Sequence, residues 1–144
     1  MTVVIILGVI SGMALTRLGG STISTAEGAG FSRRVALGLN MARRRAISSG
    51  NNAAVVLLRD GGAVTSATLV EVIGGSDVPI EDSVPVPNGL TVTTAADRWE
   101  FDYTGALVAP ASGGLIQVEA PTWRWQITTQ PLTGHVGLQK LSNP

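Results

Sequence analysis

Residues 31–59, FSRRVALGLNMARRRAISSGNNAAVVLLR, contain the change of pattern that decides the fold. In the first part, apolar side chains recur at the spacing of one helix face, and this stripe comprises Phe31, Val35, Leu39, Ala42 and Ala46. Gly50, which two asparagines follow, is a typical helix stop. The compact apolar run at 53–59 then predicts a β-strand. An amphipathic helix therefore leads directly into a β-rich region.

The region before this helix is strongly apolar. Residues 3–15, VVIILGVISGMAL, carry no charge, and as a helix these 13 residues would measure only ~20 Å against a ~30 Å hydrocarbon core. By length, the run is a buried core helix or a truncated membrane span. A cleavable secretory signal is a third interpretation, but no basic segment precedes the run. Gly19 and Gly20 interrupt the helical pattern, so we expect a new helix start at Ser21 or Thr22.

The remainder of the chain has the character of β-strands. Short apolar or alternating segments predict strands at 53–59, 68–73, 90–94, 98–103, 115–119, 123–129 and 135–140. We expect a loop at 76–89, which holds three prolines, and a hairpin turn at Thr104-Gly105. Because no helical pattern separates these strands, they should pair antiparallel in one or two sheets. The predicted fold class is α+β: a long N-terminal α-helix, apolar in its first half and amphipathic in its second, packed on an antiparallel β-sheet head.

The composition excludes several classes of function. The chain has 144 residues, the size of one domain, with no cysteine and one histidine. Disulfides, thiolate metal sites, cysteine nucleophiles and sites with two imidazoles are therefore excluded. Residues 1–50 carry a net charge of +5 and residues 51–144 a net charge of −5. This asymmetry favours attraction between the helix of one copy and the head of another, although ordinary solvated charge is the simpler interpretation.

Three stretches in this order resemble the type IV pilin-like proteins, and within them the GspH/FimT group of minor pseudopilins. The run at 3–15 is similar to the apolar half of a pilin helix just after its cleavage motif. The segment LNMARRRAISSG at 39–50, followed by AAVVLL, resembles the end of the group's helix and its first strand. FDYTG at 101–105 and WRWQITTQPLTGHVGL at 123–138 resemble its closing strands. Residues 60–97 have no counterpart in this resemblance.

The resemblance implies a division of the chain into three parts. Residues 1–18 would be a half-helix for the membrane and the filament core, 19–50 an amphipathic helix, and 51–144 the β head. Family precursors carry a basic leader, a Gly-Phe junction and a glutamate that would fall immediately before Met1, so we expect about six further mature residues upstream. These would bring the apolar run close to the ~20 residues that span a bilayer. The implied location is the bacterial inner membrane, with one pass and a periplasmic head, and then a pilus or pseudopilus.

The resemblance also assigns the apolar half-helix a packing role. Before assembly it would lie in membrane lipid, and in the filament it would pack against the helices of other pilin subunits. The residues we expect to pack are Val3, Val4, Ile5, Ile6, Leu7, Gly8, Val9, Ile10, Gly12, Met13 and Leu15. Gly8 and Gly12 have the GxxxG spacing of close helix contacts, although a glycine-rich chain holds such pairs by chance. Leu37 and Met41 form a second apolar pair beside the main stripe and predict a contact with a neighbouring element.

No pattern in the sequence indicates catalysis, a cofactor, a metal or a small-molecule substrate. Trp123 and Trp125, like Trp99, Phe101 and Tyr103, alternate as one face of a strand; we interpret them as core rather than as a stacking platform. The carboxylates Glu100 and Asp102 and the lone His135 are interpreted as solvated surface. The paired glycines lack the lysine and helix start of a phosphate-binding loop.

Three hypotheses of function remain from the sequence. The first is a structural subunit of a type IV pilus-like filament that serves secretion or pilus formation. The second is a DNA-binding competence pilin that uses Arg43, Arg44 and Arg45, although these arginines point to several sides of the helix, which makes nucleic acid an improbable partner. The third is a secreted β-domain whose first helix is only core.

Overall fold

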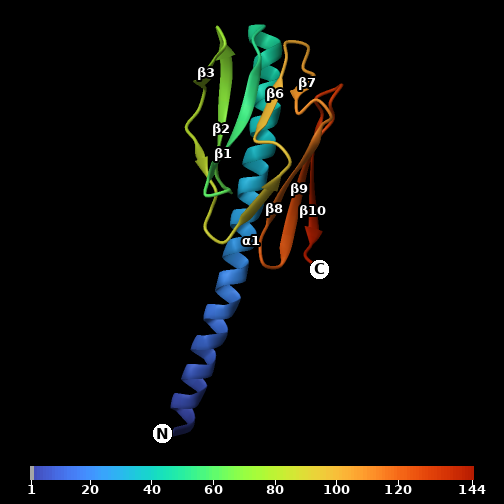
Figure 1. The fold of residues 1–144 in the computed structure, drawn as a ribbon. Coiled ribbons are helices and arrows are strands. Elements are labelled where there is room, and N and C mark those ends of the chain that lie inside the picture. The colour runs from blue at the N-terminus through green and yellow to red at the C-terminus, as the bar shows by residue number, and fades with distance from the viewer. Residues whose placement is uncertain (1) are drawn as a thin grey trace.

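The computed structural model describes the backbone of residues 2–144 and the side chains of residues 22–144. One helix, α1 (Thr2–Ser49), precedes ten strands. The strands are β1 (Ala53–Asp60), β2 (Ala63–Ile73), β3 (Ser76–Pro79), β4 (Val84–Pro85), β5 (Thr91–Thr94), β6 (Arg98–Phe101), β7 (Leu107–Ala109), β8 (Gly114–Glu119), β9 (Trp123–Thr129) and β10 (Val136–Ser142). The predicted fold class, a long N-terminal helix packed on an antiparallel β head, is confirmed (Figure 1).

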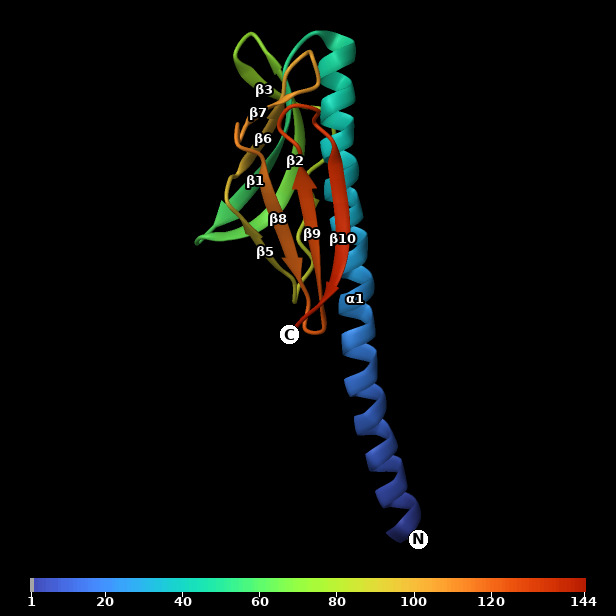
Figure 2. The same ribbon diagram turned by 90° about the vertical axis from the view of Figure 1, so that its right-hand side faces the viewer.

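The strands form two antiparallel sheets that both pack against the second half of α1; they stand on either side of the helix in Figure 1 and on the same side of it in Figure 2. The first sheet has the order β3-β2-β1-β6-β7, with β4 also pairing with β2. The second sheet has the order β10-β9-β8-β5. In the first sheet β1 is central, since Val55 pairs with Leu69 of β2 on one side and with Trp99 of β6 on the other.

The core lies where the predicted helix stripe meets both sheets. Every member of that stripe is buried, as predicted: Phe31, Val35, Leu39, Ala42 and Ala46. The sheets contribute Trp99, Phe101, Ile116, Trp125 and Ile127, among others. Trp125 lies directly on Gly28 of α1, where a Cβ atom on the glycine would stand only 2.6 Å from ring atom Cη2. A residue without a side chain thus lets the largest aromatic group reach the helix backbone.

The helix ends where the sequence predicts, but it has no second start. The N–H of Gly50 donates to the carbonyl of Ala46 at 3.0 Å, and its φ of +75° is the left-handed conformation that glycine adopts freely. The expected break at Gly19 and Gly20, with a new start at Ser21 or Thr22, is wrong: α1 is continuous from Thr2 to Ser49. Two glycines weaken helix propensity by roughly 1 kcal/mol each but do not forbid helix.

Two other expectations are corrected within the head. The stretch at 76–89 is not only a loop, since β3 and β4 within it pair along β2, with Val70 opposite Pro79 and Ser66 opposite Pro85. Prolines are tolerated there because these short strands lie at the edge of the sheet. The strand β7 is a further element that the sequence pattern does not predict. The predicted hairpin turn at Thr104-Gly105 connects β6 to it.

Candidate interaction surfaces

The first candidate surface is the part of α1 that projects from the head. Both views show the first half of the helix extending well beyond the strands (Figures 1 and 2). Among the helix residues whose side chains the structure describes, Thr22 and Thr25 line a hollow opposite Thr122 and Trp123 of the head. The packing residues predicted between Val3 and Leu15 have their backbone in this helix, but their side chains lie outside the described residues.

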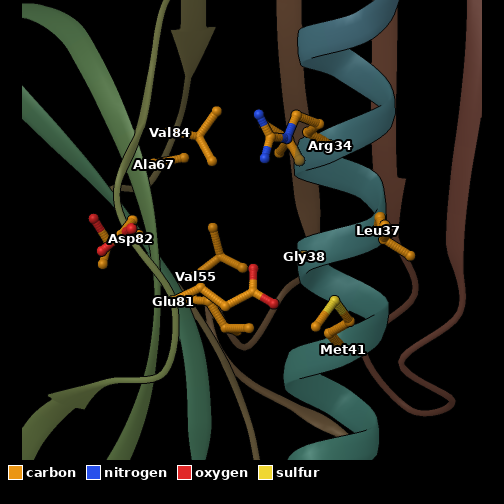
Figure 3. A pocket seen from close by; sticks show the side chains of 12 residues that line it. Arg34, Leu37, Gly38, Met41, Val55, Ala67, Glu81, Asp82 and Val84 are labelled. Atoms are coloured by element: carbon orange, nitrogen blue, oxygen red, sulfur yellow. The ribbon is translucent and has the colours of Figure 1, made fainter.

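The second candidate surface is a groove between α1 and the segment that connects β3 to β4 (Figure 3). Its volume is about 260 Å³. Arg34, Leu37, Gly38 and Met41 line it from one face of the helix, as their spacing of three and four residues requires. Val55, Ala67 and Leu69 form its apolar floor, and Glu81, Asp82 and Val84 form the opposite wall.

The groove has an apolar floor and charged rims of opposite sign. Arg34 stands on the helix side, while Glu81 and Asp82 stand on the strand side, and all three are exposed. No ion pair within 4.0 Å joins Arg34 to either carboxylate in the described part of the chain. Gly38 leaves the Val55 side chain accessible from the helix side of the groove, because a Cβ atom at residue 38 would contact a methyl group of Val55 at 3.6 Å. The groove therefore suits a partner that places an apolar group on the floor and a charged group at one of the rims.

Leu37 and Met41 lie at this groove. Leu37 is 58% exposed and stands on the outer side of the helix, while Met41 is half-buried and packs against the core. Their placement beside the main stripe is the one expected from the sequence. The contact expected between this pair and a neighbouring element stays a prediction.

The three arginines proposed for nucleic acid have different surroundings. The Nε–H of Arg43 donates to the carbonyl of Gly105 at 3.2 Å, which ties the helix to the β6–β7 turn. Arg45 forms an ion pair with Glu71 of β2 at 2.8 Å. Arg44 is exposed, with no hydrogen bond or ion pair to another described residue. The cluster is thus divided between two arginines that are tied to the head and one that, among the described residues, is not.

The ion pair between Arg45 and Glu71 fastens the C-terminal end of α1 to β2 of the first sheet. Glu71 is only 4% exposed and also accepts a hydrogen bond from the side chain of Asn51 at 3.1 Å. Hydrogen bonds from Asn51, Arg45 and Ser49 lower the pKa of Glu71 below its ordinary value, and the positive charge of Arg45 acts in the same direction. This carboxylate therefore stays ionised in the folded protein and fixes the helix end.

The aromatic residues are mostly core, as predicted. Trp99, Phe101 and Trp125 are buried, and Trp123 is half-buried with the Nζ of Lys140 4.0 Å above its ring centroid. The expectation is wrong for Tyr103, which is 66% exposed. It lies after the end of β6, where the chain turns and the alternation of faces no longer holds.

The polar candidates Glu100, Asp102 and His135 take part in local structure. Glu100 accepts hydrogen bonds from Asn52 and Arg98, at 2.7 and 2.5 Å. Asp102 accepts hydrogen bonds from Thr104, whose side chain and backbone lower the pKa of this carboxyl. His135 is exposed. Among the described residues, no three His, Asp or Glu side chains gather as metal ligands would.

Within the described part of the chain, no helix combines the length and the apolar character that crossing a membrane requires.

Of the comparisons with known proteins, the one with solved structures identifies the fold. No protein-family model and no curated protein matches the chain in sequence. Among solved structures, it is similar to the type IV minor pilin FimU of Pseudomonas aeruginosa, with 16% identity and a TM-score of 0.60 over 75% of this chain and 89% of that one. A second crystal form of FimU gives a TM-score of 0.57 over 86% and 90% of the two chains, at 16% identity.

A protein named for a different machine has the same fold. The minor pseudopilin EpsH from the type 2 secretion system of Vibrio cholerae is 16% identical, with a TM-score of 0.58 over 83% of this chain and 96% of that one. The chain therefore has a pilin-like fold, in the form found in minor pilins and minor pseudopilins.

Proposed function

We propose that the chain is a structural subunit of a type IV pilus-like filament, of the minor pilin or minor pseudopilin kind. The observation that carries this proposal is the continuous helix, which is core of the head in its second half and projects from it in its first. The projecting half contains the uncharged run at 3–15. Such a surface needs lipid or other helices around it, because apolar area in water is unfavourable.

In this proposal the projecting segment has two successive environments. It first anchors the protein in the inner membrane, with the head in the periplasm, and then packs against the helices of other subunits. Small residues such as Gly8 and Gly12 would permit close approach between helices. The protein would act in secretion or pilus formation by packing and not by catalysis.

A truncation tests this proposal against a secreted β-domain whose first helix is only core. The helix residues that pack in the core begin at Ala29 and Phe31 among the described side chains, and the first half of α1 projects from the head, so a chain without residues 1–18 should keep its unfolding midpoint and become soluble without detergent. The full chain should sediment with membranes and resist extraction by alkaline carbonate. A truncated head that unfolds, together with a full chain that stays in the soluble fraction, would favour the secreted domain.

A further inference from the structure

We infer that the base of the head binds the phosphate groups of anionic membrane lipids through Trp123 and Lys140. The base of the head is the end from which α1 projects, where Figure 2 shows the β8–β9 hairpin and the end of β10. The inference rests on the proposed function, since it needs a chain whose projecting helix half is seated in a bilayer.

A hollow of about 450 Å³ lies at this end of the head. Small side chains line it from α1, and the start of the β8–β9 pair forms its other wall: Thr22, Thr25, Ala26, Ala29, Thr122 and Trp123. Trp123 is the one large side chain among them, and it is half-buried. Part of its ring is therefore accessible on the side of the head that faces the projecting segment.

Lys140 adds a positioned cation to this end of the head. It pairs with Trp125 in the β9–β10 register, so its side chain leaves the strand on the side of the sheet that faces α1. It nevertheless lies outside the core, since it is exposed and its Nζ stands 4.0 Å above the centroid of the Trp123 ring. In the part of the chain that the structure describes, no carboxylate lies within 4.0 Å of this ammonium group.

A tryptophan and a lysine in this arrangement have the chemistry of a membrane-surface contact. Tryptophan is enriched where membrane meets water, because its ring is apolar and its indole N–H donates a hydrogen bond. A lysine close to an anionic lipid surface strengthens binding by about fivefold. Both N–H groups are donors, so the lipid phosphate is the group that both can contact.

The position of the pair along α1 agrees with this contact. The uncharged run ends at Leu15, and Thr22 and Thr25 follow it by ~10–15 Å of helix. The headgroup layer takes up about 5–8 Å of that distance. The remainder is comparable to the Debye length of ~8 Å at physiological salt, so the charge of anionic headgroups acts on Lys140.

Quenching of tryptophan emission tests the contact in the full chain. The chain is reconstituted in phosphatidylcholine vesicles that contain a fixed trace of lipid with a nitroxide on its headgroup and a rising fraction of phosphatidylglycerol. We expect quenching to increase with the fraction of phosphatidylglycerol. The other two tryptophans, Trp99 and Trp125, are buried, so Trp123→Phe should abolish this dependence.

Two charge variants identify the cation. Lys140→Gln should raise the fraction of phosphatidylglycerol needed for half-maximal quenching by about fivefold. Arg44→Gln is the matched control, since Arg44 is also an exposed cation but lies ~30 Å further along α1 than Thr25. It should leave that fraction unchanged. Inorganic phosphate added to vesicles of phosphatidylcholine alone should not change the emission of Trp123.

The outcomes separate this inference from the filament proposal. Quenching that does not depend on phosphatidylglycerol, or equal responses of Lys140→Gln and Arg44→Gln, would overturn the inference. A response of Trp123 to inorganic phosphate alone would overturn it too, because the site would then take free phosphate and not a lipid. In each case a chain that floats with the vesicles and resists carbonate extraction leaves the filament proposal standing. A chain that does not float with the vesicles would overturn both.

Discussion

Replacing Gly28 with alanine is expected to destabilise the protein, although alanine is the better helix former. The added Cβ atom would stand 2.6 Å from Cη2 of Trp125 and closer still to Cζ3 of the same ring. Ordinary carbon contacts are ~3.5–4.0 Å, so the indole ring must move by about 1 Å or more. The ring is only 3% exposed and packs in the core, where other side chains leave it little space.

The magnitude follows from two opposing effects. Gly to Ala within a helix stabilises by ~0.5–1 kcal/mol, since glycine loses more conformational freedom on folding. Overpacking a close-packed site costs ~1–3 kcal/mol. We expect a net loss of ~1–2 kcal/mol, which for a domain of this size lowers the melting temperature by roughly 2–8 °C.

Gly30 provides the matched control, because it lies in the same helix and a Cβ atom there would meet no described atom within 4 Å beyond its own helix backbone. Gly30→Ala should therefore raise the free energy of unfolding by ~0.5–1 kcal/mol. Urea denaturation followed by tryptophan emission, with the full chain in detergent micelles, measures both variants. If Gly28→Ala proves as stable as Gly30→Ala, the packing of Trp125 on the helix backbone is not as described.

Three further predictions concern other contacts of the head. Glu71 has a lowered pKa, because Asn51 and Arg45 donate hydrogen bonds to its carboxylate, so its stabilising effect is complete above the ordinary carboxyl pKa of ~4.3 and is lost as the pH falls through the lower folded value. Glu71→Gln should therefore flatten the fall of the unfolding midpoint in acid, below the ordinary carboxyl pKa. Arg43→Ala should lower the free energy of unfolding, because it removes the hydrogen bond to Gly105. Arg44→Ala should change the free energy of unfolding by no more than ~0.5 kcal/mol, because Arg44 is exposed. Equal effects of the two substitutions would contradict their different surroundings. Gly114→Ala should cost ~1–3 kcal/mol by the same denaturation assay, since its Cβ would stand 2.9 Å from Cη2 of Trp99.

The elements with strong periodicity could be predicted from the sequence. The helix stripe from Phe31 to Ala46 and the strands near 53–59 and 123–129 depend on local spacing, and the structure buries the expected side chains. The continuity of α1 through Gly19 and Gly20 could not be predicted, because two glycines weaken a helix by an amount that its neighbouring turns can offset. The short edge strands β3, β4 and β7 are set by their pairing partners and not by their own pattern.

Only the helix side of the candidate groove could be predicted from the sequence. The spacing of Leu37 and Met41 places an apolar pair beside the main helix stripe. What faces them depends on where residues 80–83 lie, and this follows from the pairing of Pro79 with Val70 and of Val84 with Ala67. Register over such distances is a tertiary property, and a proline-rich segment gives little local signal for it. The role of Gly28 beneath Trp125 is likewise visible only in three dimensions.

The continuity of α1 also has a consequence for the order of events on assembly. An isolated helix must first form a nucleus, which is unfavourable by a factor of ~10⁻³, whereas each later residue adds to an existing turn. In this protein the folded head holds the second half of α1 in place and so supplies that nucleus permanently. The first half of α1 needs only helix propagation from that nucleus, which must pass Gly19 and Gly20, where helix propensity is low. The segment can therefore meet its partners already helical, with its direction set by the head.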